Sequence, residues 1–462
     1  MRRSDRNRPS LTHLTRKELI ELIQDLQQQV AKLREENERL KRSQRRQAAP
    51  FSKENPVKNP KKPGRKKGEG PFNRRQAPAA TPDIVIDVQA PESCPDCGGW
   101  LDQQGVEEAT TTELPEQPKP KVTQYRVAVC HCSKCGKKVR GTAPGLAADQ
   151  YGATAHRVGP GLMAAAHALH YSVGVPQRKI PLVLKELTGV SVTQSAIAQD
   201  ALRRAKGQVG AEYERLRDTV RDRPYVHTDD TGWRVGGKPA FLMGFDTDQT
   251  TIYQVRFQHR NEEVREIIPS NYDGVMITDR GKSYDAKAFD NVDQQKCLGH
   301  IQRNIHGVLE TQHGGAKQFG LKTKGLIQEA MALGEARQGL PEAEYNLKVE
   351  DVTARLTYQL RDRILEDDAN QTLLNGLGTQ DDKGRLMRFL YSPFVDPTNN
   401  QGERIIRPAV ILRKVSQCSK NEAGAYAFSA FASIAQTARK ASASVTSTFK
   451  LLFSSPPQPQ TG

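Results

Sequence analysis

The sequence predicts a multidomain α+β protein, and three observations carry that prediction. A leucine-rich heptad pattern near the N-terminus predicts a coiled coil, and two Cys-x-x-Cys pairs further along predict a zinc ribbon. From residue 224 the hydrophobic pattern changes to the period of strands, and a long helical block follows the strands. The chain has 462 residues, which is enough for about two to four domains with at least one sizeable core.

The charge of the chain is unevenly distributed. The formal net charge is +16, and residues 41–76 contain thirteen Lys or Arg against two acidic residues. A basic segment with Pro and Gly cannot bury a core and is expected to stay flexible. Its expected partner is a polyanion, with nucleic acid as the leading candidate, and a solvated linker without a ligand is the alternative. The candidate nucleic-acid contacts are Lys61, Lys62, Arg65, Lys66 and Lys67.

The sequence gives no sign of membrane association or secretion. No apolar stretch reaches membrane-spanning length, and the N-terminal residues 1–6 lack the apolar core of a signal peptide. Seven cysteines, five of them between 94 and 135, fit a cytosolic metal site better than a disulfide framework. These features predict a cytoplasmic protein.

Residues 11–45 are predicted to form a coiled coil. The heptad places Leu19, Leu26, Leu33 and Leu40 at d positions, and Ile23, Val30 and Asn37 at a positions. Such a seam favours a parallel two-stranded coiled coil, in which Asn37 fixes the register. We therefore predict self-association, as a homodimer or a higher assembly. An amphipathic helix packed against its own domain is the alternative.

Residues 46–85 are predicted to be a basic flexible linker, and residues 86–150 a zinc ribbon. Two Cys-x-x-Cys knuckles, each followed by glycine, can place four thiolates tetrahedrally around zinc and leave no open position. The zinc is therefore expected to be structural rather than catalytic. Residues 121–129 between the knuckles alternate like a strand. The predicted ligands are Cys94, Cys97, Cys132 and Cys135, with Cys130 and His131 as competing candidates.

Residues 151–222 are predicted to be wholly helical. A helix, a short turn containing Gly189 and a second helix from Thr193 resemble a helix-turn-helix. The basic residues of the second helix stand toward its far end, at Arg203, Arg204 and Lys206. Because base contacts usually come from the N-terminus of such a helix, an ordinary helical hairpin is an equal alternative.

Residues 223–304 are predicted to form the first part of an α/β domain. The expected elements are strands at 225–229, 241–245, 251–257 and 274–279, a turn at Gly236-Gly237, and a helix over 262–268 capped by Asn261. A helical connection lets the last strand lie parallel to the first. Asp229 and Asp279 then come near the same end of neighbouring strands, where open α/β sheets place their sites.

Carboxylates from separate elements can share divalent metal ions, and two-metal sites of that kind cut and join phosphodiesters. Asp229 and Asp230 are consecutive on a strand, so only one of them can easily share a metal with Asp279. The spacing alone does not choose between the two. A strand end with solvated acids is the alternative.

Residues 305–395 are too long for a loop and are predicted to form a helical insertion. Upstream of it, Cys297 and His300 share a helical face. They are predicted to shape the site or bind metal, with a core cysteine and a capping histidine as the alternative. Residues 396–450 complete the domain, and residues 451–462 are predicted to form a disordered tail.

Glu403 opens a predicted helix in the second part of the domain. With Asn400 as N-cap, Glu403 would stand at N3 and complete a capping box. Arg407 at i+4 would be its ion-pair partner. Metal ligation and capping are therefore equal alternatives for Glu403. Pro408 is expected to end or kink this helix.

Several motifs follow one another in a specific order: His227-Thr-Asp-Asp-Thr-Gly-Trp233, Asp279, Cys297-x-x-His300, Asn399-Asn-x-x-Glu403-Arg-x-x-Arg407-Pro408 and Arg413-Lys-Val-Ser416. Together with the coiled coil, the Lys-Pro-Gly-Arg linker and the two knuckles, they resemble the transposases of the insertion sequence 66 family, bacterial enzymes with a DDE catalytic triad. The resemblance covers nearly the whole chain. It implies a ribonuclease-H-like catalytic domain, with the triad at Asp229, Asp279 and Glu403. The family usually has Glu where this chain has Asp230.

The resemblance also implies a mechanism and partners. Mg²⁺ (or Mn²⁺), held by the triad and by substrate phosphate, would support cleavage and strand transfer of DNA during transposition. His300 and Arg407 are expected to hold phosphate or orient Glu403. The implied partners are element ends and target DNA in a synaptic assembly, and the implied location is the bacterial nucleoid. The alternative function is a non-catalytic, zinc-containing DNA-binding regulator derived from a transposase, and a nuclease acting on RNA is a weaker third possibility.

Overall fold

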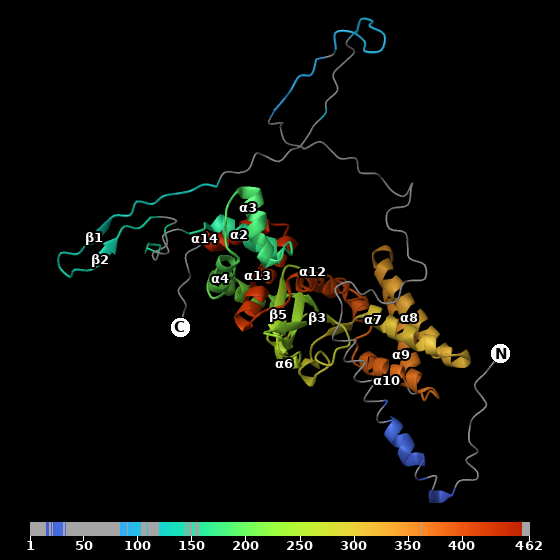
Figure 1. Ribbon diagram of the computed structural model, residues 1–462. Coiled ribbons are helices and arrows are strands. Elements are labelled where there is room, and N and C mark those ends of the chain that lie inside the picture. Colours follow the sequence, from blue (N-terminus) through green and yellow to red (C-terminus); the bar gives the residue numbers. More distant parts are fainter. Residues whose placement is uncertain are drawn as a thin grey trace. The chain divides into compact units, whose positions relative to one another are not determined.

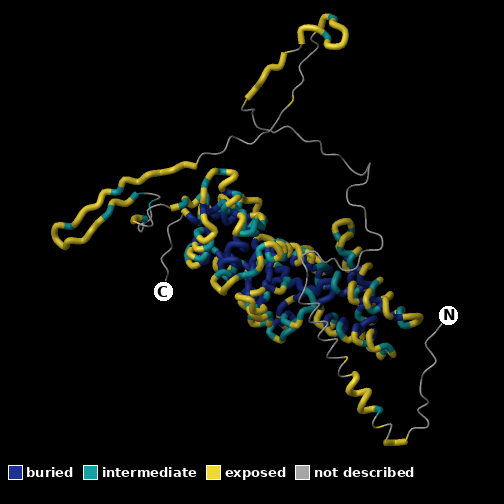
Figure 2. The backbone as a smooth tube through the Cα atoms, in the orientation of Figure 1, coloured by how far each residue is buried: buried dark blue, intermediate teal, exposed yellow. Residues whose placement is uncertain are grey.

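The computed structural model describes residues 15–17, 20, 22–30, 33, 84–89, 91–102, 109, 120–143, 146, 150–152, 157–361 and 363–454 (Figure 1). The chain divides into two compact units, Met1–Leu114 and Pro115–Gly462, and each is described by itself. Among the described residues, those that are buried lie between Met163 and Phe453, in the second unit (Figure 2).

A five-stranded mixed sheet forms the centre of the second unit. Its strands are β3 (Tyr225–Val235), β4 (Lys238–Asp246), β5 (Thr251–Arg256), β6 (Val275–Thr278) and β7 (Gln294–Lys296). They lie in the order β5-β4-β3-β6-β7, with β3, β4 and β5 antiparallel and β6 and β7 parallel to β3. The predicted α+β class is thereby confirmed, and so is the parallel pairing of the first strand with the strand before Asp279.

Local sequence explains most of these strands. Gly236 and Gly237 both have positive φ, 57° and 81°, which the two-residue turn between β3 and β4 requires. All of β6 is buried, as expected of a parallel strand covered on both faces. The sequence does not predict β7, because its residues Gln-Gln-Lys are polar. They are nevertheless buried, and Gln295 donates a hydrogen bond to the carbonyl of Leu386.

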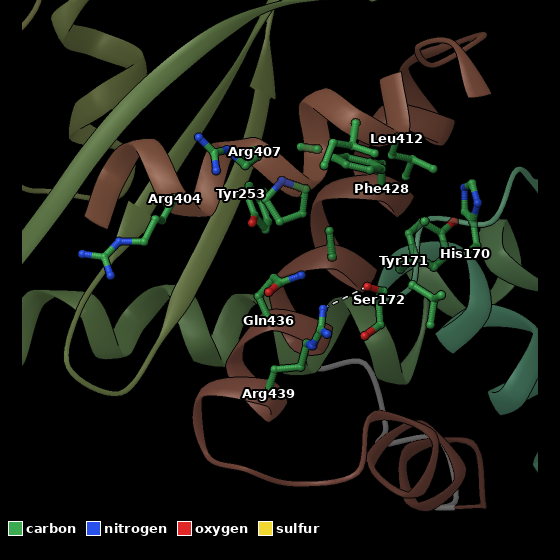
Figure 3. A pocket seen from close by; sticks show the side chains of 16 residues that line it. His170, Tyr171, Ser172, Tyr253, Arg404, Arg407, Leu412, Phe428, Gln436 and Arg439 are labelled. Atoms are coloured by element: carbon green, nitrogen blue, oxygen red, sulfur yellow. Dashed lines mark hydrogen bonds between the residues drawn. The ribbon is translucent and has the colours of Figure 1, made fainter. Parts of the chain in front are cut away.

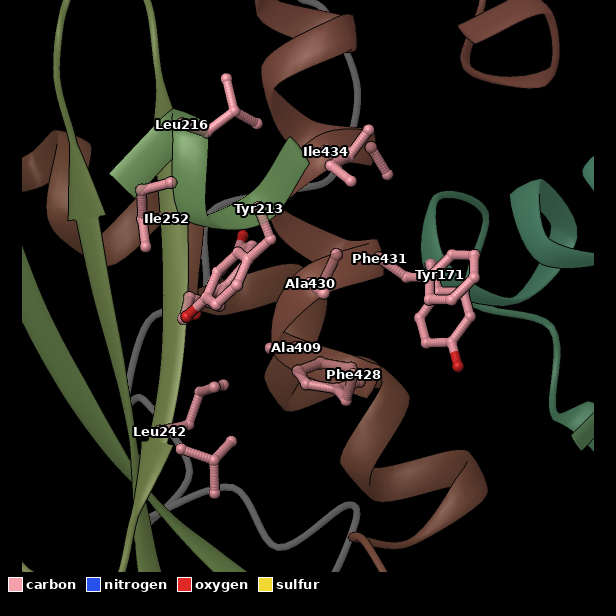
Figure 4. Packing of buried hydrophobic residues seen from close by; sticks show 14 of the residues in the cluster. Tyr171, Tyr213, Leu216, Leu242, Ile252, Ala409, Phe428, Ala430, Phe431 and Ile434 are labelled. Atoms are coloured by element: carbon pink, nitrogen blue, oxygen red, sulfur yellow. The ribbon is translucent and has the colours of Figure 1, made fainter. Parts of the chain in front are cut away.

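A first set of helices packs with the sheet around the larger of two apolar cores. The set comprises α2 (Pro160–Tyr171), α3 (Ile180–Thr188), α4 (Gln194–Ala205), α5 (Gln208–Thr219), α12 (Asn400–Ser416), α13 (Glu422–Lys440) and α14 (Val445–Ser454). Helix α13 contacts β5, α5 and α2 and places Phe428 and Phe431 in this core (Figure 4). Phe431 stacks on Tyr171 with 4.7 Å between ring centroids. The helices before and after the sheet therefore share its core.

A second set of helices fills the chain between β7 and α12. The set comprises α7 (Leu298–Thr311), α8 (Lys317–Ala336), α9 (Glu342–Leu360), α10 (Asp368–Asp382) and α11 (Arg388–Tyr391). These helices have their own apolar core, which includes Val275 and Ile277 of β6. A buried ion-pair cluster joins them to the sheet: Asp285 Oδ1 lies 2.9 Å from Lys296 Nζ and 3.2 Å from Arg385 Nη1.

One predicted helix boundary is wrong, and at Pro408, where the sequence predicts an end or a kink, the helix end does not occur. Helix α6 (Asn261–Arg265) has Arg260 as its N-cap, so Asn261 is the first helical residue rather than the cap, and the helix is shorter than predicted. Helix α12 does not end at Pro408 but continues to Ser416. Packing on the sheet holds it there, because Gly244 of β4 leaves room for Ile405, whose Cδ1 would lie 2.8 Å from a Cβ at that glycine.

The helix pair predicted on either side of Gly189 is present as α3 and α4, and its turn follows from local sequence. Gly189 ends α3 with a φ of 70°, and Thr193 caps α4 by accepting a hydrogen bond from the N–H of Ala196. Arg204 is buried, with Nε 2.7 Å from Asp200 and the guanidinium over the ring of Phe453. Arg204 is therefore committed to the core rather than to an external ligand.

The same cluster makes stability depend on pH. Burial favours the neutral form of Asp200, but hydrogen bonds and charges from His167 and Arg204 prevail and lower its pKa to about 2, from an ordinary 3.8. A pKa lowered by folding stabilises the protein above the unfolded value, and that stabilisation is lost as pH falls through the folded value. We expect the free energy of unfolding in urea to fall about 2 kcal/mol more between pH 4 and pH 2 in the wild type than in Asp200→Asn. An equal fall in both proteins would contradict this.

The described N-terminal residues are consistent with a helix. Those between Arg16 and Leu33 are helical, and Ile23, Leu26, Val30 and Leu33 of the predicted seam are each exposed by 45% or more. Leu19, Asn37 and Leu40 lie outside the described residues, as do the linker cations Lys61, Lys62, Arg65, Lys66 and Lys67. The coiled coil and the linker contacts therefore stay predictions. No described helix has both the length and the apolar composition that crossing a membrane requires.

Candidate active site

Strands β3 and β6 carry two of the predicted carboxylates to one place on the sheet. The strands are parallel, and His227 pairs with Ile277. Asp229 lies two residues beyond His227, and Asp279 lies two residues beyond Ile277, directly after β6 ends. Because matched positions of parallel strands lie side by side, Asp229 and Asp279 meet at the end of the β3–β6 pairing.

Asp229 stands in a strongly acidic environment. Burial raises the pKa of this carboxyl to about 6, and the negative charges of Asp230, Asp279 and Glu403 act in the same direction. A hydrogen bond from the backbone N–H of Asp230 to Oδ1, 2.9 Å long, opposes the rise. Asp279 and Glu403 are thus both close enough to act electrostatically on Asp229.

Asp279 is held by the loop that follows β6. Its Oδ1 accepts a hydrogen bond of 2.8 Å from the backbone N–H of Gly281. A Cβ at Gly281 would lie 2.9 Å from the same oxygen, so the tight turn there requires glycine. The preceding Thr278 accepts a hydrogen bond of 3.1 Å from Lys296 Nζ. The loop and β7 together fix the position of Asp279.

Glu403 adopts neither of the local arrangements that the sequence allows. The N-cap of α12 is Asn399, so Glu403 stands one residue beyond N3, and no side-chain capping bond is present at this end of the helix. The partners of Glu403 come instead from α7, where Arg303 Nη2 lies 3.1 Å and His300 Nε2 lies 3.8 Å from Oε1. Arg407 is not its ion-pair partner and lies one turn further along α12. The side chain of Glu403 therefore faces α7.

Asn399 connects the elements that carry these side chains. It is fully buried, and its Nδ2 donates a hydrogen bond of 2.8 Å to the carbonyl of Thr228, directly before Asp229. Its Oδ1 accepts from Nδ1 of His227 at 3.1 Å, and its backbone N–H donates to Cys297 Sγ at 3.1 Å. One residue, through its side chain and its backbone N–H, thus fixes the start of α12 relative to β3 and the start of α7.

Cys297 and His300 lie together at the start of α7, as predicted. Burial favours the neutral thiol of Cys297, but contacts with His300 and the N–H of Asn399 outweigh burial and lower the pKa of the thiol. The thiol in turn raises the pKa of His300. Nδ1 of His300 is buried and has no hydrogen-bond partner among the described residues. The contact with Cys297 therefore favours the protonated, positively charged form of His300 beside Glu403.

The comparison with known families identifies the chain. A family model described as Transposase IS66 family matches residues 155–427, which is more than half of the chain and includes Asp229, Asp279 and Glu403. The chain belongs to the IS66 family of transposases. The resemblance seen in the sequence is thereby confirmed, and membership implies a transposase function and binding to DNA. No curated protein matches the chain.

The transposase surrounds its carboxylates with residues that the sequence analysis did not single out. Asp230, the departure from the usual family pattern, lies 3.2 Å from Nδ1 of His259, whose Nε2 is 3.3 Å from the hydroxyl of Ser283. Nothing in the sequence signals this contact or the position of Lys296. The sequence does indicate the position of Arg303, because Arg303 follows His300 by three residues on a helix and so shares its face.

The transposase has two cysteine turns of the same form, one in each unit. The N–H of Cys94 donates to the carbonyl of Gly99 (2.9 Å), and the N–H of Cys132 donates to that of Lys137 (2.9 Å). Nearby backbone groups lower the thiol pKa in both turns, led by Asp96 for Cys94 and by Cys135 for Cys132. A lowered pKa favours the thiolate that zinc binds.

The second cysteine turn lies in a short hairpin of β1 (Val129–His131) and β2 (Lys138–Arg140). The strand predicted over 121–129 is wrong, because only its last residue belongs to β1. Across the described residues, no three or more His, Cys, Asp or Glu side chains stand in a ready metal-binding arrangement.

Proposed function

We propose that this transposase cuts and rejoins DNA at a site built from Asp229, Asp279 and Glu403. The observation that carries the proposal is the parallel pairing of β3 with β6, which places Asp229 and Asp279 at matched positions. The charges of Asp279 and of Glu403 on α12 both raise the pKa of Asp229, which supports a place for all three in one site. The strand order, with three antiparallel strands followed by two parallel ones, supports a ribonuclease-H-like catalytic domain. The separate core of helices α7–α11 supports the proposed insertion.

The carboxylates suit divalent metal ions, which DDE transposases generally use. Asp229 is stabilised in its neutral form by burial and by like charges, so a bound cation would relieve the repulsion. Carboxylate oxygens are the ligands that Mg²⁺ and Mn²⁺ prefer. When bound at Asp229, Asp279 and Glu403, these ions would polarise phosphate oxygens and lower the pKa of a water nucleophile.

The chain's own residues prepare this chemistry. Asn399 holds α12 against β3, which keeps Glu403 near the two aspartates. Arg303 and His300 neutralise Glu403 and so reduce repulsion within the acidic cluster. The side chain of Arg303 is 64% exposed, which leaves its guanidinium free to pair with a DNA phosphate as well. Cys297 supports His300 from the buried side.

A strand-transfer assay with the purified full-length chain, its element ends and a target duplex tests the proposal. With Mg²⁺ or Mn²⁺ we expect nicks at the element ends and joined products, and with a chelator we expect neither. Sequence-specific binding without cleavage under any divalent metal would support the non-catalytic regulator instead.

We also propose structural zinc at Cys94, Cys97, Cys132 and Cys135, supported by the identical turns and lowered thiol pKa values. The purified protein is expected to contain about one zinc ion per chain by elemental analysis, since four thiolates close one tetrahedral site. Cys94→Ser and Cys132→Ser should each lose the zinc, because either change opens the site. Cys130→Ser, the matched control in the same hairpin, should keep it. Zinc retained in Cys94→Ser would show that the ligand set is wrong.

Two further parts of the proposal lie at the N-terminus. We propose that residues 11–45 pair two chains through a coiled coil, within a dimer or a larger synaptic assembly. The seam residues exposed in the single chain support this pairing. We propose that the basic linker, including Lys61, Lys62, Arg65, Lys66 and Lys67, contacts DNA phosphates, as its net charge favours.

A further inference from the structure

A pocket of about 370 Å³ lies between α12, α13 and the segment that follows α2 (Figure 3). Its walls include Tyr253 and Phe428, and three arginines line it: Arg404 and Arg407 from α12, and Arg439 from α13. All three arginines are exposed, and Nη1 of Arg439 donates a hydrogen bond of 3.0 Å to the carbonyl of Ser172. The pocket therefore combines an apolar wall with a cationic rim.

A second pocket, of about 590 Å³, adjoins the first at the C-terminal end of α12. The two share His170, Tyr171, Leu412 and Phe428 as a common wall. The second pocket also has three exposed cations, Arg178, Lys414 and Lys420, and Trp233 contributes to its wall. We call these two neighbouring pockets along α12 the α12 groove.

The α12 groove is cationic throughout. No Asp or Glu occurs among its lining residues. Within the part of the chain that the structure describes, none of its six cations has a carboxylate partner within 4.0 Å. Other arginines on the surface are paired, for example Arg215 with Glu212 and Arg355 with Glu329. Six unpaired cations around this groove call for an anionic ligand.

We propose that the α12 groove binds a single strand of DNA and leads it to the carboxylates. This inference rests on the proposed function and adds the path of the strand. Arg404, which lines the groove, directly follows Glu403 on α12, so the same stretch of helix contributes to the groove and to the proposed site. The aromatic residues of the walls, Tyr253, Phe428 and Trp233, are at most 6% exposed, so the phosphates of the strand, rather than its bases, would make the main contacts, with the six cations. A duplex is too wide to enter two pockets of this size.

Binding of a fluorescent single-stranded oligonucleotide to the full-length chain, measured in a chelator at several salt concentrations, tests the proposal. Replacing Arg404, Arg407 and Arg439 together by Gln should weaken binding on the order of tenfold and reduce the slope of log affinity against log salt by about 2. Replacing the same three arginines by Lys should largely restore both values, since charge is kept. The control variant replaces Lys287, Lys322 and Lys324 by Gln. It removes equal charge outside the groove and should leave both values nearly unchanged.

Three outcomes would overturn the proposal. Affinity for the single strand could fall equally in the groove and control variants, it could fall only for duplex DNA, or the groove variant with three Gln could bind as the wild type does. A photo-crosslinking amino acid in place of Ile411, an exposed residue of the groove, gives an independent reading. Adducts with the oligonucleotide support the proposal, and adducts only with a second protein chain contradict it. Because these assays need no metal, they measure strand binding separately from cleavage. Asp279→Asn should bind the strand with normal affinity, whatever the outcome of the catalytic proposal.

Discussion

Asp279→Asn is expected to reduce cleavage of element ends by at least about 10³-fold, because a lost metal ligand removes several kcal/mol of transition-state stabilisation. The change is nearly isosteric, and the amide can still accept the hydrogen bond from Gly281 that holds the side chain. DNA binding should therefore persist. Gel-based cleavage kinetics with Mn²⁺, alongside a binding assay in chelator, measure the two effects separately.

Asp273→Asn is the matched control for this change. Asp273 lies six residues earlier, is exposed and precedes the same strand. The control should cleave at the wild-type rate. Wild-type cleavage by Asp279→Asn, or an equal loss in both variants, would remove Asp279 from the active site.

Asn399→Ala is expected to lower the free energy of unfolding by about 2–4 kcal/mol. The change leaves the buried carbonyl of Thr228 and Nδ1 of His227 without this partner, and each lost buried partner costs about 1–3 kcal/mol. Urea unfolding followed by circular dichroism measures the loss.

Asn400→Ala provides a control at the next position. Asn400 is exposed, so its replacement should change the free energy of unfolding by less than about 0.5 kcal/mol. If Asn399→Ala were as stable as Asn400→Ala, the proposed link between α12 and β3 through Asn399 would be wrong.

Residues whose role follows from local pattern could be predicted from the sequence. Strand β6 is a continuous apolar run, and the helical connection before it implies parallel pairing with β3, so Asp229 and Asp279 could be placed side by side. Gly236-Gly237 marked its hairpin, and Gly189 and Thr193 marked the turn between α3 and α4. In each case the deciding forces act within a few residues.

The remaining features depend on contacts between distant parts of the chain. Strand β7 is polar, and its burial depends on Asp285 and on groups from the helical insertion, such as the carbonyl of Leu386. The setting of Glu403 depends on Arg303, one hundred residues earlier. Local rules suggested a capping box and an ion pair with Arg407, but the packing of α12 on β4 and α7 decided otherwise. The same packing carries α12 through Pro408.

The central claim is that Asp229, Asp279 and Glu403 hold divalent metal together. Calorimetric titration of Mn²⁺ into the chain, with the proposed zinc retained and no DNA present, tests it most directly. We predict that Asp229→Asn, Asp279→Asn and Glu403→Gln each weaken Mn²⁺ binding by at least about tenfold, whereas Asp273→Asn binds as the wild type does. Wild-type Mn²⁺ affinity in any of the three variants would contradict the shared site.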